Sequence, residues 1–475
     1  MKEVDQNFIC QSNDSLISTM KKIDLNECGA CVVIENGKLF GIVSDGDIRR
    51  YLINGGHLNG KVGVIARRNC TFLTAETRQE YLKYLNNKIR VVPIINEQFY
   101  VEDVIGIKNP KIQVLAPYLY GNESKYVNEC FENNWISSQG QFVDKFENEF
   151  SKLHNGRKCL TTSNGTTALH LALMSAGVTE GDEIITTNLS FAATINSIIY
   201  CSATPVLCDI DEKTMCLSAE DARKKITNKT KAILIVHLYG QSCDTLALQK
   251  LAKEHEILLI EDCAESLGTK YMGCYSGTFG DIATYSFFGN KTITTGEGGM
   301  VSFKADNYYS RARKLRDHGM SNKKRYYHDV VGYNYRLTNI QAAIGCAQLE
   351  KLDTILELKR NIMRIYNDFF KDKTYFTQLP FNNEDSEHSN WLYTPRLKDF
   401  ELRDEFIRFL TLNKIESRPG FVPFSQMEIY KKYVGNSSLC VSEKISRELI
   451  SLPSHPSLDK DDLKRVVDIV DQFFK

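Results

Sequence analysis

The sequence predicts an α/β fold with a mostly parallel sheet. Between residues 134 and 355, apolar β-branched runs such as "EIITT", "KAILIV" and "EILLI" show no polar alternation. Helical patterns such as "TTALHLALMSAG" and "DTLALQKLAKEHE" separate these runs. Strands of this kind are buried on both faces, as in a parallel sheet covered by helices. Residues 356–475 combine a long helical pattern with short strands, which predicts a smaller α+β domain.

The first part of the chain, residues 1–109, differs in its sequence pattern from the rest. In "CVVIENGKLFGIVSDGDIRRYL", two β-rich runs are joined by Asn36-Gly37, a strong hairpin signal, and a helix is expected near Asp47. A fainter copy, "VVPIINEQFYVEDVIGI", predicts an internal repeat of about 50 residues. The two prolines in "KNPKIQVLAP" mark a linker. The expected domains are therefore 1–109, 110–355 and 356–475.

The composition excludes several classes of protein. Lys+Arg and Asp+Glu balance at 59 each, so we expect neither nucleic acid nor a membrane surface as a partner. The sequence has neither a leader-like segment nor an apolar run of the ~20 residues that span a bilayer, so a cytoplasmic protein is expected. The 14 cysteines are scattered through apolar stretches, which favours reduced core residues. Cys28 and Cys31 form a lone CxxC; core packing is favoured over zinc or redox chemistry, and no metal is predicted.

Reactive side chains follow several predicted strands, at the edge where open α/β sheets bind ligands. Asp262 ends the run "EILLIED", and Lys291 follows "TYSFF". The sequence around Lys291, "SFFGNKTITTGEGGM", does not match the GxxxxGK[ST] phosphate loop, and the residues after it are too rich in glycine for a helix. A nucleotide loop is therefore not expected here.

These residues together predict a pyridoxal phosphate (PLP) site. A lysine at the end of a buried strand is costly when charged and unpaired, and Schiff-base chemistry requires such a lysine, here Lys291. The pyridine nitrogen needs a buried carboxylate, for which Asp262 is placed. The phosphate needs N–H groups at a helix start, which Gly165, Thr166 and Thr167 offer, with a hydroxyl from Ser286. Phe191 could stack on the ring.

Four segments carry a family resemblance. The segments "SNGTTALHLAL", "EDCAESLGTKY", "GTFGDIATYSFFGNKTITTGEGGMV" and "VVGYNYRLTNIQAAIGCAQLE" resemble the DegT/DnrJ/EryC1/StrS sugar-nucleotide aminotransferases, PLP enzymes of the aspartate-aminotransferase (type I) fold. The resemblance extends over about residues 113–475.

Within that family, "NNWISSQGQFVDKFENEF", "IESRPGFVPF" and "LPSHPSL" are most similar to the GDP-perosamine-forming branch. This resemblance implies transfer of the amino group of L-glutamate to C4 of GDP-4-keto-6-deoxymannose, through pyridoxamine phosphate, for O-antigen or another surface polysaccharide. A UDP- or dTDP-linked keto sugar is the alternative substrate.

The resemblance assigns further roles. Lys291 matches the lysine that condenses with the cofactor, and histidine at that position would imply dehydratase chemistry instead. Asp262 matches the partner of the ring nitrogen, and Glu265 stands near the ring hydroxyl. Asn334 matches an asparagine that reaches the cofactor phosphate of the neighbouring subunit, which implies a homodimer with composite sites.

Candidates for holding the nucleotide sugar come from three segments. Arginine suits a diphosphate through its bidentate fork, although Arg418 could equally form a surface ion pair. His318 and Phe191 replace residues that are more usual in the perosamine branch, which leaves the sugar open. The candidates are Trp135, Ser137, Ser138, His318 and Arg418.

The N-terminal segment "GIVSDGDIRRYL" resembles a cystathionine-β-synthase (CBS) domain, and its fainter copy suggests a pair. Ser44 and Asp47 match the family's hydroxyl and ribose-contacting positions, which implies regulation by an adenine or guanine nucleotide. A packing or oligomerisation module that binds nothing is the equal alternative. A nucleotide sensor on an inactive aminotransferase scaffold is disfavoured by the complete set of site residues.

Overall fold

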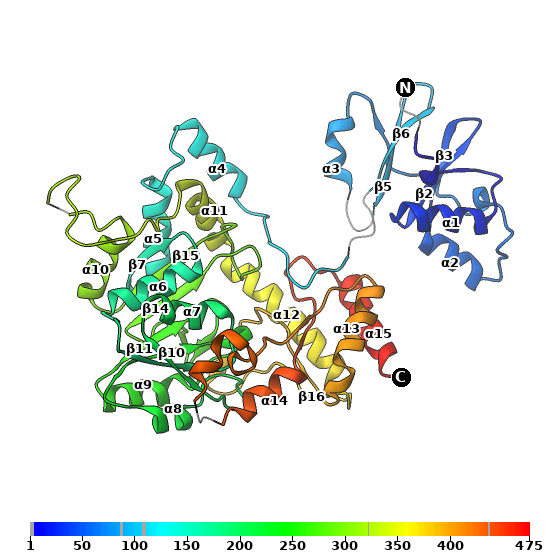
Figure 1. Cartoon of the computed structure of the whole chain (residues 1–475). Coiled ribbons are helices and arrows are strands. Elements are labelled where there is room, and N and C mark those ends of the chain that lie inside the picture. Colours follow the sequence, from blue (N-terminus) through cyan, green and yellow to red (C-terminus); the bar gives the residue numbers. More distant parts are fainter. Residues whose placement is uncertain (1–3, 86–88, 107–110, 322, 436–437) are drawn as a thin grey trace. The chain divides into compact units, whose positions relative to one another are not determined.

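The computed structural model describes residues 4–85, 89–106, 111–321, 323–435 and 438–475 (Figure 1). The chain forms two compact units, residues 1–111 and 112–475. The first boundary lies close to the predicted one at 109. The predicted boundary at 355 falls inside the helix Leu352–Phe370, so this helix continues from one expected domain into the next.

Unit 1 contains two three-stranded sheets of the same topology. In each sheet the first two strands are parallel and the last two antiparallel. One sheet comprises β1 (Ile9–Gln11), β2 (Ala30–Glu35) and β3 (Lys38–Ser44). The other comprises β4 (Leu73–Thr74), β5 (Val91–Ile95) and β6 (Val101–Gly106). The copied strand pattern is present, but the spacing from Ala30 to Val91 is longer than the predicted repeat, because residues 54–72 extend the connection between the copies.

The hairpin between β2 and β3 forms where the sequence predicts it. Asn36 and Gly37 have φ of 52° and 79°, the left-handed conformations that a two-residue hairpin turn requires. Helix α2 begins at Asp45, capped by the Ser44 side chain. The helices of unit 1 are α1 (Leu16–Asn26), α2 (Asp45–Ile53) and α3 (Tyr81–Tyr84), with short 3₁₀ turns η1 (Gln6–Phe8), η2 (Val62–Val64) and η3 (Arg78–Glu80).

Unit 2 is built on a seven-stranded, mostly parallel sheet. Only β15 runs antiparallel to its neighbours within this sheet. The strands, in spatial order, are β7 (Lys158–Thr162), β15 (Gly299–Phe303), β14 (Ile282–Ser286), β11 (Leu258–Asp262), β10 (Thr230–Val236), β8 (Glu183–Thr187) and β9 (Thr204–Cys208). The predicted α/β class is confirmed.

Both faces of this sheet are buried, as the unbroken apolar runs predict. Alternate residues of one strand enter different cores. Leu160 packs with α6 (Gly165–Ser175) and α10 (Asp306–Arg316), whereas Cys159 packs with α5 (Gln141–Leu153) and α11 (Asn339–Glu350). The helices around the sheet are α4 (Glu123–Glu132), α5 (Gln141–Leu153), α6 (Gly165–Ser175), α7 (Ala192–Tyr200), α8 (Ala219–Lys225), α9 (Thr245–Glu254), α10 (Asp306–Arg316) and α11 (Asn339–Glu350), with the 3₁₀ turn η4 (Leu238–Gly240).

The C-terminal part of unit 2 is the predicted mixture of helices and short strands. Its helices are α12 (Leu352–Phe370), α13 (Arg403–Leu412), α14 (Cys440–Glu448) and α15 (Lys460–Phe473), with 3₁₀ turns η5 (Phe400–Leu402), η6 (Phe424–Gln426) and η7 (Glu428–Tyr433). Its short strands form the pairs β16–β18 (Phe376–Gln378, Arg396–Leu397) and β19–β20 (Arg418–Pro419, Ile450–Ser451). A further strand, β17 (Ser386–Glu387), pairs with β12 (Lys270–Tyr271) of the preceding part, which also pairs with β13 (Cys274–Tyr275). Within the described ranges, every helix is too short or too polar to span a bilayer.

Candidate active site

Asp262 is the last residue of β11 and lies buried at the carboxyl edge of the sheet. Its Oδ2 accepts a hydrogen bond from Thr194 Oγ1 at 3.0 Å, and its Oδ1 accepts one from the Ala264 N–H at 3.1 Å. Burial raises the pKa of the carboxyl, although these hydrogen bonds and the Lys291 charge oppose the shift. The carboxylate is therefore held in one orientation at the edge that the sequence predicts.

Lys291 follows β14 and reaches the same edge. Its side chain is 13% exposed, and its Nζ lies 3.8 Å from Glu265 Oε1. Burial lowers the pKa of the amine, the negative charges of Glu265 and Asp262 oppose this shift, and the Arg418 charge adds to it. An amine with a lowered pKa is more often neutral and therefore nucleophilic at neutral pH.

Glu265 is the second buried carboxyl group beside Lys291. The carboxylate accepts a hydrogen bond from the Tyr239 N–H at 3.0 Å. Burial raises the pKa of Glu265 to about 7, and the Lys291 charge opposes this rise. Lys291 thus faces two buried acids, so the protonation state of each group depends on the others.

The start of α6 is the place where the sequence predicts the cofactor phosphate. The Asn164 side chain caps the helix by accepting from the Thr167 N–H at 2.9 Å, and Thr167 Oγ1 donates to the Asn164 carbonyl at 2.8 Å. Thr167 therefore serves the cap, and we expect an anion to meet the Gly165 and Thr166 N–H groups first. A Cβ on Gly165 would lie 2.8 Å from Ser286 Cβ, so only glycine allows Ser286 to approach this closely.

Phe191 carries the ring that the sequence predicts to stack on the cofactor. It precedes α7, and its side chain is 60% exposed, with its ring centroid 6.1 Å from that of Phe421. The Thr194 N–H donates to the Phe191 carbonyl at 3.2 Å, and Thr194 in turn binds Asp262. An exposed phenyl ring thus stands on the same short segment that orients the buried carboxylate.

Two further predicted residues lie together on another segment. Asp317 and Asn334 pair in an antiparallel bridge, and the His318 N–H donates to the Tyr333 carbonyl at 2.8 Å. Asn334 and His318 therefore belong to one local structure. Their roles in a cofactor or substrate site stay predictions.

The remaining substrate candidates lie on separate segments. Asn339 fixes the loop before α5, because its backbone N–H donates to the Ser137 carbonyl and its side chain to the Trp135 carbonyl. The Trp135 ring and Ser137 are exposed, and Ser138 is half-buried. Arg418 forms an ion pair with Glu416 at 3.3 Å, which is one of the two alternatives that the sequence left open. Its charge also lowers the pKa of Lys291.

The comparisons with known proteins address the second unit. The model of the DegT/DnrJ/EryC1/StrS aminotransferase family matches residues 117–471. The chain belongs to this family. The GDP-perosamine synthase of Vibrio cholerae is 43% identical over 76% of this chain and 99% of its own length. That of Escherichia coli O157:H7 is 44% identical over 76% of this chain and 98% of its own length.

Solved structures agree with this assignment. The aminotransferase TlmJ of Streptoalloteichus hindustanus has a TM-score of 0.73 at 27% identity, and covers 77% of this chain and 99% of its own. PseC of Helicobacter pylori, an aminotransferase of pseudoaminic acid biosynthesis, has a TM-score of 0.73 at 28% identity, with the same coverage. The predicted type I fold and the PLP dependence are confirmed, and the chain is a sugar aminotransferase.

The residues of this DegT/DnrJ/EryC1/StrS family member suit PLP. The close approach of Ser286 to Gly165 puts a hydroxyl beside a helix N-terminus, which is the chemistry of a phosphate site. Asp262 offers a fixed carboxylate for a ring nitrogen, and Lys291 offers a buried amine for an aldehyde. The exposed Phe191 offers an apolar face for a flat ring.

Two aromatic residues of the site were missed from the sequence. The Trp391 ring centroid lies 3.9 Å from Lys291 Nζ, and the Tyr239 ring stacks parallel to Trp391 at 6.4 Å. Trp391 follows Lys291 by a hundred positions, and its only sequence signal is that the chain has just two tryptophans.

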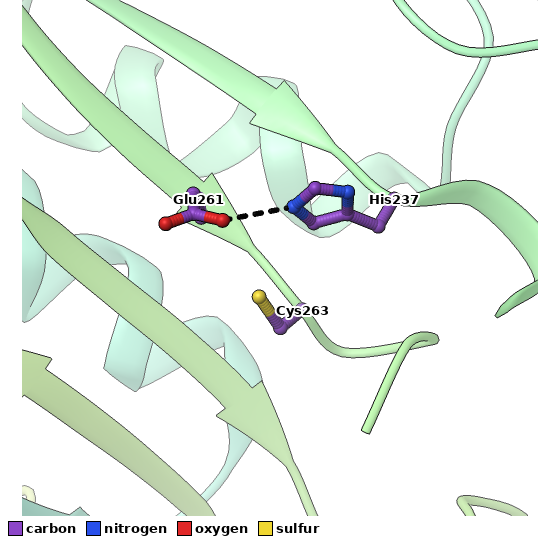
Figure 2. A group of neighbouring side chains, drawn as sticks. All are labelled: His237, Glu261 and Cys263. Carbon is purple, nitrogen blue, oxygen red and sulfur yellow. Dashed lines mark hydrogen bonds and ion pairs between the residues drawn. The ribbon is translucent and has the colours of Figure 1, made fainter. Parts of the chain in front are cut away.

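A second polar cluster on the other face of β11 is structural. His237, Glu261 and Cys263 place possible metal-ligating atoms within 4.8 Å of one another (Figure 2). His237 Nε2 lies 3.1 Å from Glu261, and His237 Nδ1 accepts from the Cys243 N–H, which assigns the Nε2 proton to the Glu261 contact.

The Glu261 carboxylate has further partners. It accepts N–H hydrogen bonds from Gly277, Phe279 and Gly280. Burial opposes ionisation, but the His237 and backbone hydrogen bonds outweigh it and lower the pKa of Glu261. With its oxygens engaged in this way, Glu261 acts as an anchor for residues 277–280.

Proposed function

We propose that this aminotransferase moves the amino group of L-glutamate to C4 of GDP-4-keto-6-deoxymannose and so forms GDP-perosamine for a surface polysaccharide. The observation that carries this proposal is the match to the GDP-perosamine synthases of Vibrio cholerae and Escherichia coli O157:H7, at 43% and 44% identity over nearly their full lengths. Its cytoplasmic location stays a prediction.

The chemistry follows from the site residues. PLP, when bound, supplies the aldehyde that takes up the amino group and the ring that accepts electrons. The lowered pKa of Lys291 would let its Nζ take a proton from the amine-bearing carbon of glutamate and deliver it to C4′ of the cofactor within the same half-reaction. The second half-reaction would run this transfer in reverse, from C4′ to C4 of the sugar. Asp262, oriented by Thr194 and Ala264, would keep a proton on the ring nitrogen. Glu265 Oε1 lies 3.8 Å from Lys291 Nζ, so the protonation state of each group depends on that of the other.

The active unit is proposed to be a homodimer in which Asn334 serves the neighbouring subunit's site. Exposed apolar side chains on the segment before Asn334 support this proposal: Tyr326 is 75% and Val331 90% exposed. Large apolar residues of this kind are typical of surfaces that a protein partner covers. Arg418 and the Trp135 loop are proposed to hold the nucleotide sugar.

The substrate is tested by assaying the purified protein with L-glutamate and a panel of GDP-, UDP- and dTDP-linked 4-keto-6-deoxy sugars. We expect the GDP sugar to be aminated at C4, with a kcat/KM at least about tenfold above the others. Higher kcat/KM for a UDP- or dTDP-linked sugar would replace the proposed substrate. No amination of any sugar would contradict the function itself.

A second proposal concerns unit 1, where Ser44 and Asp47 are proposed to bind an adenine or guanine nucleotide. Asp47 Oδ1 contacts Arg50 at 2.7 Å and Arg67 at 2.6 Å, and its Oδ2 binds the Ser44 hydroxyl and N–H. The two exposed arginines could contact phosphates, which supports binding. A ribose would have to compete with these arginines for Asp47, and the packing-module alternative therefore stays open.

A further inference from the structure

A buried lysine lies outside the groups described so far. Lys359 is on α12 and only 1% exposed, among the buried side chains of Ile355, Leu356, Ile362 and Met363. Burial lowers its pKa to about 7. A lysine on the apolar face of a helix is costly unless its donors are satisfied.

The donors of Lys359 meet three backbone carbonyls. Its Nζ lies 3.3 Å from the Asn390 oxygen, 3.2 Å from the Trp391 oxygen and 3.0 Å from the Ser454 oxygen. An ammonium has three N–H donors, so these three carbonyls match its full capacity. The Asn390 side chain donates back to the Lys359 carbonyl at 2.9 Å, which makes the contact with α12 reciprocal.

The segment 388–392 is also held from its other side. The Ser389 N–H donates to the Gly240 carbonyl at 3.1 Å, and the Leu392 N–H to the Tyr239 carbonyl at 3.3 Å. Gly240 has φ of 105°, and a Cβ there would lie 2.9 Å from the backbone nitrogen of Trp391. The backbone around Trp391 is thus fixed between α12 and η4.

This fixed backbone carries an indole that touches the site. The Trp391 ring faces Lys291, whose Nζ is 3.9 Å from the ring centroid. The Trp391 Nε1–H donates to the carbonyl of Asn290 at 2.8 Å. One side chain therefore contacts both the amine of Lys291 and the peptide group before it.

We propose that Lys359 is a positioning residue for Lys291: by holding the carbonyls of Asn390 and Trp391, it fixes the Trp391 indole against the Lys291 amine. The proposal rests on Lys291 being the lysine that binds the cofactor. The indole face stabilises positive charge on the Lys291 nitrogen, and the Asn290 contact limits where that nitrogen can move.

The test is a pH titration of the holoenzyme's visible absorption band, whose midpoint reports protonation at the Lys291 nitrogen. Trp391→Leu removes the π face, so we expect the midpoint to fall by about one pH unit, the scale of one partly desolvated cation–π contact. Trp391→Phe keeps a face and should shift the midpoint less. Lys359→Met should lower the midpoint in the same direction, with a fall in kcat and a smaller change in KM for glutamate.

Arg396→Met is the matched control. Arg396 is also buried and charged, and it pairs with Glu448 at 2.8 Å in the same part of unit 2. It should reduce thermal stability and leave the midpoint at the wild-type value. Should Lys359→Met not fold, Lys359→Arg takes its place, because the larger guanidinium displaces the same carbonyl contacts.

Unshifted midpoints in the Lys359 variant and in Trp391→Leu would overturn the positioning proposal, as would an equal shift in Arg396→Met. Failure of the underlying assignment looks different: Lys291→Ala would then retain the cofactor covalently. If Lys291→Ala loses the covalent cofactor while the other variants behave as wild type, only the positioning role is excluded.

Discussion

The candidate sites of the two units differ in how their charged side chains are paired. In unit 2, the charges of Lys291, Asp262 and Glu265 act on one another, and burial shifts the pKa of each group away from its ordinary value. In unit 1, burial opposes ionisation of Asp47, yet the hydrogen bonds of Ser44, Arg67 and Arg50 outweigh it and lower its pKa. Buried groups with competing charges are suited to proton transfer, whereas a well-paired carboxylate is stable as an anion.

The family match concerns only one of the two units. The family model covers residues 117–471 and therefore falls on unit 2. The aminotransferase chemistry therefore belongs to unit 2, and a nucleotide-binding or packing role of unit 1 stays a prediction. Substitutions in either unit test this difference between the two candidate sites.

The largest effect is expected from Lys291→Ala. Without the amine, the protein loses both the covalent attachment of the cofactor and the group that moves the proton, so activity should fall by at least about 10⁴-fold. Turnover with glutamate and the keto sugar measures this, together with the visible absorption of the protein. Lys250→Ala, an exposed lysine on α9, is the control and should behave as wild type. A yellow, active Lys291→Ala protein would contradict the assignment.

Asp262→Asn should have the next largest effect. An amide keeps the shape of the side chain but cannot hold a cationic ring nitrogen, so turnover should fall by about 10²- to 10³-fold while the fold persists. Thr194→Val removes one of the two hydrogen bonds that orient Asp262 and should cost less. Near-normal rates for Asp262→Asn, measured in the same assay, would exclude its role.

Glu265→Gln should change how stability depends on pH. The pKa of Glu265 rises from 4.5 to about 7 on folding, so the folded state binds the extra proton and the wild type loses stability as pH rises between these values. The glutamine cannot ionise, so the variant should gain stability relative to wild type as pH rises, by up to about 3 kcal/mol above pH 7. Thermal unfolding of the cofactor-free protein across this range measures the difference.

Glu350→Gln is the control with the opposite sign. Burial opposes ionisation of Glu350, but its Tyr126, Asn122 and Lys145 contacts outweigh it and lower its pKa, so its stabilisation is present at neutral pH and is lost as pH falls. If the stability of both variants relative to wild type changed with pH in the same direction, burial in the site would not be what raises the pKa of Glu265.

The smallest effect is expected in unit 1. Calorimetric titration of the full chain with ATP, AMP and GDP should give heat for at least one nucleotide, and Asp47→Asn should abolish that heat. The exposed partners of Asp47 predict only a small change in thermal stability, because ion pairs of that kind contribute about 0 to 1 kcal/mol. Absence of heat for all three nucleotides would leave unit 1 as a packing module.

The sequence predicts those parts of the site that follow directly from strand ends. Asp262 and Lys291 stand just beyond apolar runs, and the parallel sheet brings such positions to one edge. The Asn36-Gly37 hairpin and the start of a helix near Asp47 were likewise predictable, because both depend on local sequence preferences.

Long-range contacts were not predictable in this way. Trp391 contacts Lys291 from a hundred positions away in the sequence, on a segment that is hydrogen-bonded to α12 and η4, and no local pattern encodes that contact. Lys359 did leave a signal, since it falls on the apolar face of an amphipathic helix. The predicted repeat length was too short, because residues 54–72 lengthen the connection between the two copies without changing the strand pattern.

Reduction of the holoenzyme with borohydride, followed by digestion and mass spectrometry, tests the central assignment most directly. Borohydride fixes the cofactor to the amine that holds it, so the phosphopyridoxyl group should be found on Lys291. Recovery of that group on another lysine, or complete loss of the cofactor after reduction, would contradict the account.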